Sequence, residues 1–325
     1  MDDNRFVKFT ESKIGDVLRR PVLVTSIKEA IDKKDNTYVR LTLRDGCSDI
    51  TPNMFSMDKR TLENIGVVEG CIADATITVS EYGGTKNFRV DKITPTADRS
   101  ISVDDFIKTP PVPADVMFDE IVELLRSSAD DIGGTATPLA ELAISILNDK
   151  AERFKTSSAA ISMHHNFKGG LLYHTYRMVK TADAVCNIYT GLDRELLICG
   201  TALHDIGKIW EYSTTSFGEA EFTSNGILFG HLYLGASLIR QYSEKGSYNR
   251  EKVQLLTHMI LSHHGTMEFG AVKPPAFAEA FALHYIDNLD AKIGTCENYY
   301  DTLEQGGLTD KKPFGLDNRI YKPKL

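Results

Sequence analysis

An adjacent histidine and aspartate, His204-Asp205, follow an apolar run and precede Gly207 and Lys208. A neutral imidazole and a carboxylate are ligands that one divalent metal ion can share. In a chain with nine histidines such a pair readily arises by chance, so the dipeptide alone predicts little. Five further candidate ligands lie on either side of this pair: His174, His231, His263, His264 and Asp287. Along the chain the complete set has the order His, His-Asp, His, His-His, Asp.

These candidate ligands lie in segments whose apolar residues repeat with helical periodicity. The candidates lie on or at the ends of five separate predicted helices, which is how helical bundles build metal sites in their interior. Two further helices are predicted over residues 118–127 and 139–147. The second half of the chain is therefore expected to be all-α, with helices that carry the candidates at 171–188, 195–209, 231–242, 252–263 and 276–293.

The first hundred residues have a β pattern instead. Asp45-Gly46 and the segment 81–85 are expected turns, and residues 57–65 form a short predicted helix. Five short strands with one helix between the third and fourth are typical of an OB-fold barrel. The strands are predicted at residues 22–27, 38–44, 47–54, 71–79 and 86–90. The fold class is thus α+β multidomain, with a five-stranded OB-fold barrel followed by an all-α helical bundle.

OB-folds commonly hold single-stranded nucleic acid on aromatic side chains beside a basic groove. Arg40 and Arg44 share one face of a predicted strand with Tyr38, because side chains two residues apart point the same way. Some of the aromatic residues are equally expected in the barrel core. The predicted nucleic-acid-binding set is Tyr38, Arg40, Arg44, Phe55, Tyr82, Lys86, Phe88 and Arg89.

The boundary between the two halves is expected at Pro110-Pro111-Val112-Pro113, which favours an extended linker. We predict an OB-fold domain at residues 1–95, a linker at 96–115 and the helical domain at 116–300. Residues 301–325 form a locally basic tail, which contains Lys311, Lys312, Arg319, Lys322 and Lys324.

Composition and charge narrow the class of protein. The net charge is -8, and residues 1–100 contain sixteen basic and sixteen acidic residues, so the deficit lies in the second half. This argues against a general polyanion-binding surface but leaves room for a local basic groove. Five scattered cysteines without a C-x-x-C pair indicate a reduced cytoplasm. The sequence shows no signal peptide and no membrane span, and it leaves a homo-oligomer open.

The ordered ligand set resembles the HD-domain metallophosphohydrolases over residues 160–295. This resemblance implies that His174, His204, Asp205 and Asp287 hold one divalent metal. A second ion would share Asp205, with His231 and one or both of His263 and His264. Mixed imidazole and carboxylate ligands suit Mn above all, with Co, Fe, Ni, Zn or Mg also compatible, in one or two ions per site.

Other residues near the motif are candidates for roles in catalysis. Lys208 lies one helical turn after His204 and could bind a phosphate as a point charge. His165 could reach the predicted metal site beside His174, although a surface position is equally compatible with the sequence. Asp205, Lys208 and His165 are therefore the catalytic candidates. Gly207 predicts close approach by a ligand or a packed helix, because glycine is unfavourable inside helices. Groups that could orient the ligands are Glu268, Asp290 and Lys292.

An OB-like barrel joined to an HD domain is similar to the YhaM family of bacterial 3'-to-5' exoribonucleases. The similarity covers nearly the whole chain, and two short motifs carry much of it: Leu203-His204-Asp205-Ile206-Gly207-Lys208 and Leu261-Ser262-His263-His264-Gly265. Other matching segments are 169–175, 283–292 and 316–321. The resemblance implies a metal-dependent hydrolase that removes nucleotides from the 3' end of single-stranded RNA, and also of single-stranded DNA.

Two alternatives remain open at this point. The first is an HD-domain phosphohydrolase of mononucleotides or cyclic nucleotides, in which the barrel serves regulation or assembly. The second is a nucleic-acid-binding regulator with an inactive site. Dependence on polymer length separates the nuclease from the first alternative, and a metal assay separates it from the second.

Overall fold

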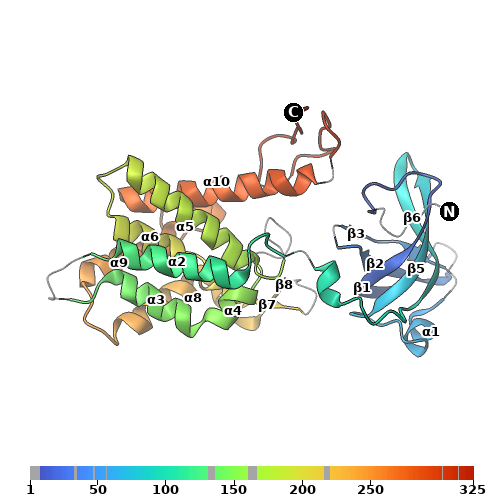
Figure 1. The fold of residues 1–325 in the computed structure, drawn as a ribbon, viewed down its shortest axis with the longest axis horizontal. Helices are drawn as coiled ribbons and strands as arrows, with labels where there is room; N and C mark the ends of the chain where they lie inside the picture. The colour runs from blue at the N-terminus through green and yellow to red at the C-terminus, as the bar shows by residue number, and fades with distance from the viewer. Residues whose placement is uncertain are drawn as a thin grey trace. The chain divides into compact units, whose positions relative to one another are not determined.

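The structure is a computed structural model that divides into two compact units, Met1–Lys108 and Thr109–Leu325 (Figure 1). The first unit is a β-barrel and the second is a helical bundle, as the sequence predicted. The structure describes residues 8–32, 35–46, 48–55, 57–107, 109–130, 136–159, 167–215, 220–301, 303–313 and 315–325.

The barrel closes through pairing of the strands that the structure describes. β1 (Val17–Ile31) pairs with both β2 (Thr37–Arg44) and β5 (Ile72–Tyr82), and β5 pairs with β6 (Thr85–Pro95). The short strand β4 (Asn53–Met54) runs parallel to β6 and antiparallel to β2, which closes the ring. This order, with a helix between the third and fourth segments, is that of an OB-fold.

The alternation of side chains explains how the barrel strands bury one face. In β2, Val39, Leu41 and Leu43 are fully buried, while Tyr38 and Arg40 lie on the outer face. The predicted third strand forms two short pieces, β3 (Asp49–Ile50) beside β2, and β4. The predicted helix is α1 (Lys59–Asn64), which begins at Asp58, whose carboxylate accepts a hydrogen bond from the Thr61 N–H.

Part of the expected linker has regular structure. Residues Val103–Phe106 form a 3-10 helix, η2, and both Phe106 and Ile107 are buried. The division of the compact units falls between Lys108 and Thr109, inside the expected linker at residues 96–115. Apolar side chains within this polar stretch explain the 3-10 helix, because they stabilise local structure that linker composition alone does not predict.

The second unit is built of helices (Figure 1), which pack around one apolar core. α5, α9 and α10 correspond closely to predicted helices, and two short strands pair in a hairpin after α7. The elements are α2 (Ala114–Ser128), α3 (Leu139–Asp149), α4 (Ala151–Thr156), α5 (Gly170–Ile188), α6 (Arg194–Leu203), α7 (Lys208–Glu211), β7 (Tyr212–Thr214), β8 (Ala220–Phe222), α8 (Ser224–Ser243), α9 (Arg250–Ser262), η3 (Met267–Phe269) and α10 (Ala278–Tyr300).

The predicted helix over residues 195–209 is interrupted in the structure. α6 ends at Leu203, the chain turns through residues 204–207, and α7 begins at Lys208. Gly207 packs directly against α8, since a Cβ atom there would lie 2.1 Å from the His231 carbonyl oxygen. The close neighbour that this glycine predicted is therefore a packed helix. The turn directs His204 and Asp205 into the bundle interior, where they are almost completely buried.

The basic tail folds back on itself after α10. Leu308 and Tyr321 form an antiparallel bridge, and Ile320 and Thr309 are buried. The Lys322 ammonium donates hydrogen bonds to the carbonyl oxygens of Tyr300 and Leu303, which attaches the tail to the end of α10.

Candidate active site and nucleic-acid interface

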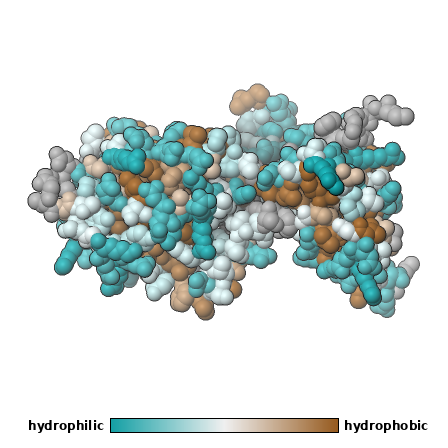
Figure 2. Space-filling model, turned by 60° about the horizontal axis from the view of Figure 1, so that its bottom comes forward, coloured by the Kyte–Doolittle hydropathy of each residue, from teal (hydrophilic) through white to brown (hydrophobic). Residues whose placement is uncertain are grey.

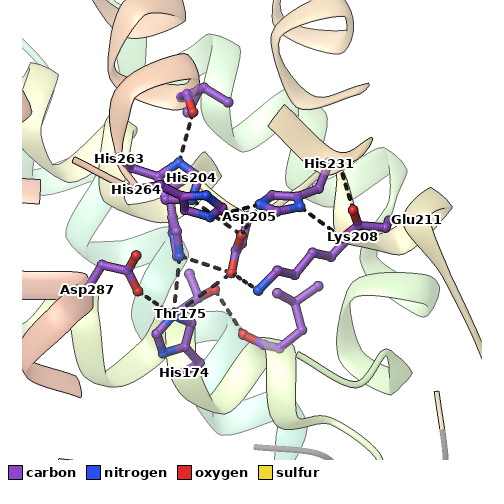
Figure 3. Close-up of polar contacts among 12 residues, drawn as sticks. His174, Thr175, His204, Asp205, Lys208, Glu211, His231, His263, His264 and Asp287 are labelled. Atoms are coloured by element: carbon purple, nitrogen blue, oxygen red, sulfur yellow. Dashed lines mark hydrogen bonds and ion pairs between the residues drawn. The ribbon is translucent and has the colours of Figure 1, made fainter. Parts of the chain in front are cut away.

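Side chains from five separate segments meet inside the helical bundle (Figure 3). Among the described residues, two groups bring three potential ligand atoms within 4.8 Å of one another. One group is His174, His204 and Asp287, and the other is His231, His263 and His264. The structure thus brings together all the histidines and aspartates that the sequence assigned to the metal site, including both members of the His263-His264 pair.

Asp205 lies between the two groups and faces both. Its Oδ2 atom is 3.2 Å from His204 Nε2, and its Oδ1 atom is 3.5 Å from His231 Nε2 and 3.6 Å from His263 Nε2. Oδ1 is buried and has no hydrogen-bond partner among the described residues. An unsatisfied buried carboxylate oxygen is costly, and a cation beside it would satisfy it. The donor set of five imidazoles and two carboxylates therefore fits a divalent transition metal.

The five imidazoles share one orientation: each holds Nδ1 outside the cluster and directs Nε2 into it (Figure 3). Nδ1 of His204 and His263 lies 2.8 Å from the backbone carbonyl oxygens of Thr201 and Ile260. Nδ1 of His264 lies 2.9 Å from the Phe269 carbonyl oxygen. Such partners fix the tautomer in which Nε2 is free to bind a metal.

Two carboxylates hold the remaining imidazoles in the same way. His231 Nδ1 lies 2.8 Å from Glu211 Oε2, and His174 Nδ1 lies 2.7 Å from Asp290 Oδ2. The sequence named Asp290 as an orienting group but did not identify Glu211. The helical spacing of Glu211 from Lys208 was the available signal, because residues three apart lie on one face of a helix.

Glycine at position 230 allows the Glu211 contact. Gly230 adopts a left-handed φ of 69° within α8, which separates the first turns of the helix from the part that begins at His231. The His231 backbone N–H is thereby free to donate a hydrogen bond to Glu211 Oε1 at 3.1 Å. Glu211 is thus bound by both the backbone and the side chain of His231, and this contact fixes the ring.

The electrostatics differ between the two groups. Burial lowers the pKa of His174, but hydrogen bonds with Asp287 and Asp290 outweigh burial and raise that pKa to about 9. Burial and the neighbouring rings of His263 and His231 lower the pKa of His264 to about 3. The pKa of Asp287 is below its usual value because the hydrogen bond from His174 outweighs the effect of burial. The carboxylate-rich group therefore favours positive charge more than the imidazole-rich group does.

Lys208 lies beside the shared carboxylate. Its ammonium is 2.7 Å from Asp205 Oδ2, and both side chains are largely buried. Burial opposes the charge of Lys208, but Asp205 outweighs that effect and raises the pKa of the lysine. Lys208 is thus a cation at the edge of the cluster, where it can contact an anionic group near the ligands.

Other predicted site residues have different surroundings. His165 lies outside the described residues. Glu268 and Lys292 are exposed. Asp290, in contrast, is buried and contacts both His174 and Arg177. His258, which the sequence did not assign to the site, is outside both ligand groups and packs against Phe277.

On the barrel, some of the predicted nucleic-acid contacts form one connected surface. Arg40 is paired in register with Asn53, and Asn53 with Arg89, across β2, β4 and β6. The Tyr38 and Phe55 rings lie 5.1 Å apart at this surface, and Phe55 is 62% exposed. The Arg40 guanidinium donates to the Tyr38 hydroxyl oxygen at 3.2 Å. Aromatic rings beside a cation are suited to stacked bases and phosphates.

The remaining predicted residues of the barrel are held differently. Arg44 forms a bidentate contact with Asp49 at 2.7 and 2.8 Å, and Lys86 donates to backbone carbonyl oxygens near the start of the described chain. Phe88 packs against the core beside Phe9, which agrees with the alternative that some aromatics belong to the core. Tyr82, at the β5–β6 turn, is 80% exposed.

The surface of the molecule mixes polar and apolar side chains on the face shown in Figure 2. Among the helices of the described chain, none combines the length and apolar character needed to cross a bilayer. The described cysteines, Cys71, Cys186, Cys199 and Cys296, are all free.

Comparison with known proteins gives a consistent family. The HD domain family matches residues 171–292. The chain is 31% identical to the 3'-5' exoribonuclease YhaM of Bacillus subtilis (strain 168) over 314 residues, 96% of each chain. It is 30% identical to YhaM of Geobacillus sp. (strain WCH70) over 313 residues, 96% of this chain and 93% of the relative.

A weak likeness to a solved structure was also found. The second OB-fold domain of replication protein A from Methanococcus maripaludis covers 28% of this chain and 94% of its own, with 20% identity and a TM-score of 0.22. That likeness adds nothing to the strand order described above. The similarity to the curated exoribonucleases extends through both units, and the chain therefore belongs to the YhaM family of 3'-5' exoribonucleases.

Proposed function

We propose that this protein is a metal-dependent exoribonuclease that removes nucleotides from the 3' end of single-stranded RNA and also acts on single-stranded DNA. The observation that carries the proposal is the buried cluster in which six potential ligand side chains surround a seventh, Asp205. Membership of the YhaM family supports the polymer and the direction of attack. The free cysteines support a reducing, cytoplasmic location.

The ligand assignment follows the two groups. His174, His204 and Asp287 would hold one ion, and His231, His263 and His264 would hold a second, with Asp205 close to both groups. We expect Mn²⁺, because mixed imidazole and carboxylate ligands suit it. When bound, the ions supply Lewis-acid activation of water and of the scissile phosphate.

The chain's own residues position the reacting groups. Glu211 and Asp290 hold the His231 and His174 rings, so that these ligands are ordered before substrate binds. Lys208 is fixed by Asp205 and is placed to contact a non-bridging phosphate oxygen as negative charge develops. On the barrel, Tyr38, Arg40 and Phe55 bind the strand upstream of its 3' end through stacking and phosphate contacts.

The decisive test uses single-stranded RNA labelled at its 5' end, purified protein and Mn²⁺. We expect a ladder that shortens from the 3' end, and no ladder with Asp205→Asn. The matched control is Asp183→Asn, which removes a carboxylate that pairs with Arg194 and lies outside both ligand groups. Equal ladders from wild type and Asp205→Asn would refute the assignment of the site.

Other outcomes separate the alternative functions. Binding of uncut RNA by metal-loaded protein would indicate the regulator with an inactive site. Hydrolysis of mononucleotides or cyclic nucleotides, with no effect on RNA of any length, would indicate the small-nucleotide phosphohydrolase. DNA of the same sequence, tested in parallel, decides whether the activity extends to single-stranded DNA.

A further inference from the structure

A pocket lies next to the cluster of candidate metal ligands and is lined by other residues. Its volume is about 390 Å³, within the range of small-molecule sites. The lining comes from α4, α7, the β7 strand and the start of α8. None of the seven candidate metal ligands takes part in it. Its lining includes Arg153, Ser157, Trp210, Tyr212, Thr214 and Asn225.

The lining has the charge of an anion site. Among the described residues that line the pocket, Arg153 is the one charged side chain and none is a carboxylate. Within the described part of the chain Arg153 forms no ion pair, in contrast to nearby Lys155, which pairs with Asp115 at 2.6 Å. A guanidinium without a carboxylate partner favours an oxyanion such as phosphate, with which it can form two parallel hydrogen bonds.

The rest of the lining fits a nucleoside. Trp210 is partly buried against the bundle core and supplies an indole ring, the side chain that binds flat aromatic groups over the largest area. Hydroxyl groups of Ser157 and Thr214 and the amide of Asn225 offer donors and acceptors for ribose and base edges. One cation, one indole and several neutral hydrogen-bonding groups match the composition of a nucleotide with a single phosphate.

The pocket and the ligand cluster share α7, which has only four residues. On this helix Lys208 contacts Asp205, and Glu211 contacts His231. The two residues between them, Ile209 and Trp210, line the pocket. The outer surface of this turn is also anchored to the pocket wall, because the Thr223 hydroxyl donates to the Trp210 carbonyl oxygen at 2.5 Å. A ligand that contacts Trp210 therefore lies within one helical turn of the residues that position the reaction.

We propose that this pocket binds a single nucleotide unit, with the base against Trp210 and the phosphate at Arg153. The inference rests on the proposed nuclease function for its choice of a nucleotide over other small anions. Two sources offer the same chemistry: the released nucleoside monophosphate, and a nucleotide of the bound strand.

The chain offers a direct readout, because Trp210 is its only tryptophan. We would titrate full-length Asp205→Asn protein with nucleoside 5'-monophosphate in the presence of a chelator and record tryptophan fluorescence. Removing metal keeps the phosphate from binding through ions at the ligand cluster. We expect saturable quenching, with about tenfold weaker binding in Arg153→Gln, which loses a charge-assisted hydrogen bond.

Controls make the result specific. Arg240→Gln on α8 removes the same charge from an 82% exposed side chain outside the pocket and should leave the binding curve unchanged. The unphosphorylated nucleoside should bind about tenfold more weakly than the monophosphate in protein with Arg153, and equally weakly in Arg153→Gln. Absence of quenching, quenching that Arg153→Gln does not weaken, or an equal response to inorganic phosphate would overturn the proposal.

Kinetics on active protein then distinguish the two sources. If the pocket holds a nucleotide of the strand, Arg153→Gln should raise KM for oligonucleotide RNA several-fold with kcat unchanged. If it holds the free product, inhibition by nucleoside monophosphate should weaken while KM for RNA stays the same. No change in either quantity would refute a role in the reaction. The fluorescence result needs no cleavage, so it can succeed even if the proposed nuclease function fails.

Discussion

At the scale of single residues, the feature that defines the site is that Nδ1 of each imidazole has a hydrogen-bond partner within the protein, which leaves Nε2 for a metal ion. Backbone carbonyl oxygens or carboxylates occupy Nδ1 of the five histidines, and each Nε2 faces Asp205 or a neighbouring ligand. The cost of ordering the rings is thus met when the protein folds, and the cluster is ready to bind metal.

Glu211→Gln tests the importance of this ordering. Glutamine keeps the size of the side chain but removes the charge that makes His231 a stronger ligand, so we expect Mn²⁺ affinity to fall about 10- to 100-fold. Binding of Mn²⁺ to metal-free protein, followed by electron paramagnetic resonance, measures the change. Glu244→Gln, at a 68% exposed side chain, is the matched control and should bind Mn²⁺ as the wild type does. Equal affinities in all three proteins would contradict the prediction.

His258 provides a prediction about acid stability that is independent of the metal. Burial lowers its pKa, and its buried Nε2 atom has no hydrogen-bond partner among the described residues. Because the unfolded chain protonates this group more readily, its contribution to stability is present above about pH 6.5 and is lost as pH falls toward the lower folded-state pKa. Replacement by phenylalanine should therefore flatten the decline of the melting temperature in mild acid, as measured by calorimetry. An unchanged slope would show that other groups control acid stability.

At the scale of elements, the interruption between α6 and α7 is what turns His204 and Asp205 inward. It depends on close contact between residue 207 and α8, where a side chain has no room. Because α8 also carries His231, the same contact sets the distance between the two groups of ligands. Packing and the chemistry of the site are therefore coupled at Gly207.

Gly207→Ala should destabilise the protein, although alanine is normally the more favourable residue in a helix. The new Cβ would lie 2.1 Å from the His231 carbonyl oxygen, so α7 or α8 must shift, at a cost of about 1–3 kcal/mol. We expect a lower free energy of unfolding and weaker Mn²⁺ binding. Gly191→Ala is the control, because no other group lies within 4 Å of the place that its new Cβ would occupy. If the two alanine variants unfold at the same denaturant concentration, the packing argument fails.

At the scale of the whole molecule, we expect the two compact units to divide the work that a polymer-cleaving hydrolase needs. The helical unit contains the buried cluster, and the barrel contains the exposed aromatic and basic surface. We therefore expect substitutions in the full chain to change polymer binding and phosphodiester hydrolysis separately.

Arg40→Gln and Phe55→Ala should each weaken RNA binding, but with different salt dependence. Loss of one phosphate contact at Arg40 should reduce the slope of log K against log salt by about 0.7. Loss of stacking at Phe55 should weaken binding by about 1–3 kcal/mol without changing the slope. Fluorescence anisotropy with labelled RNA at several salt concentrations measures both quantities.

The control for these two variants is Arg60→Gln, an exposed cation on α1 of the same barrel, which should leave the slope unchanged. Hydrolysis of bis(p-nitrophenyl) phosphate, a substrate without nucleobases or a polynucleotide backbone, should be the same in all the variants. Loss of that activity in Arg40→Gln or Phe55→Ala would show that the units do not act separately.

The sequence by itself determined the fold class, the order of the strands and the residue types of the metal site. These features are readable because strand alternation, helical periodicity and the order of histidines and aspartates are properties of short segments. The fold class and the family were confirmed, whereas the catalytic and nucleic-acid-binding roles of individual residues stay predictions.

Only the tertiary structure decided how the site is assembled. Neighbours on a helix point about 100° apart, so spacing could not show that both His263 and His264 enter the cluster. Glu211 holds His231 across 20 residues, and Asp290 holds His174 across 116. The break before α7 likewise depends on a contact between Gly207 and another helix. Such features follow from packing between distant segments, which local sequence patterns do not encode.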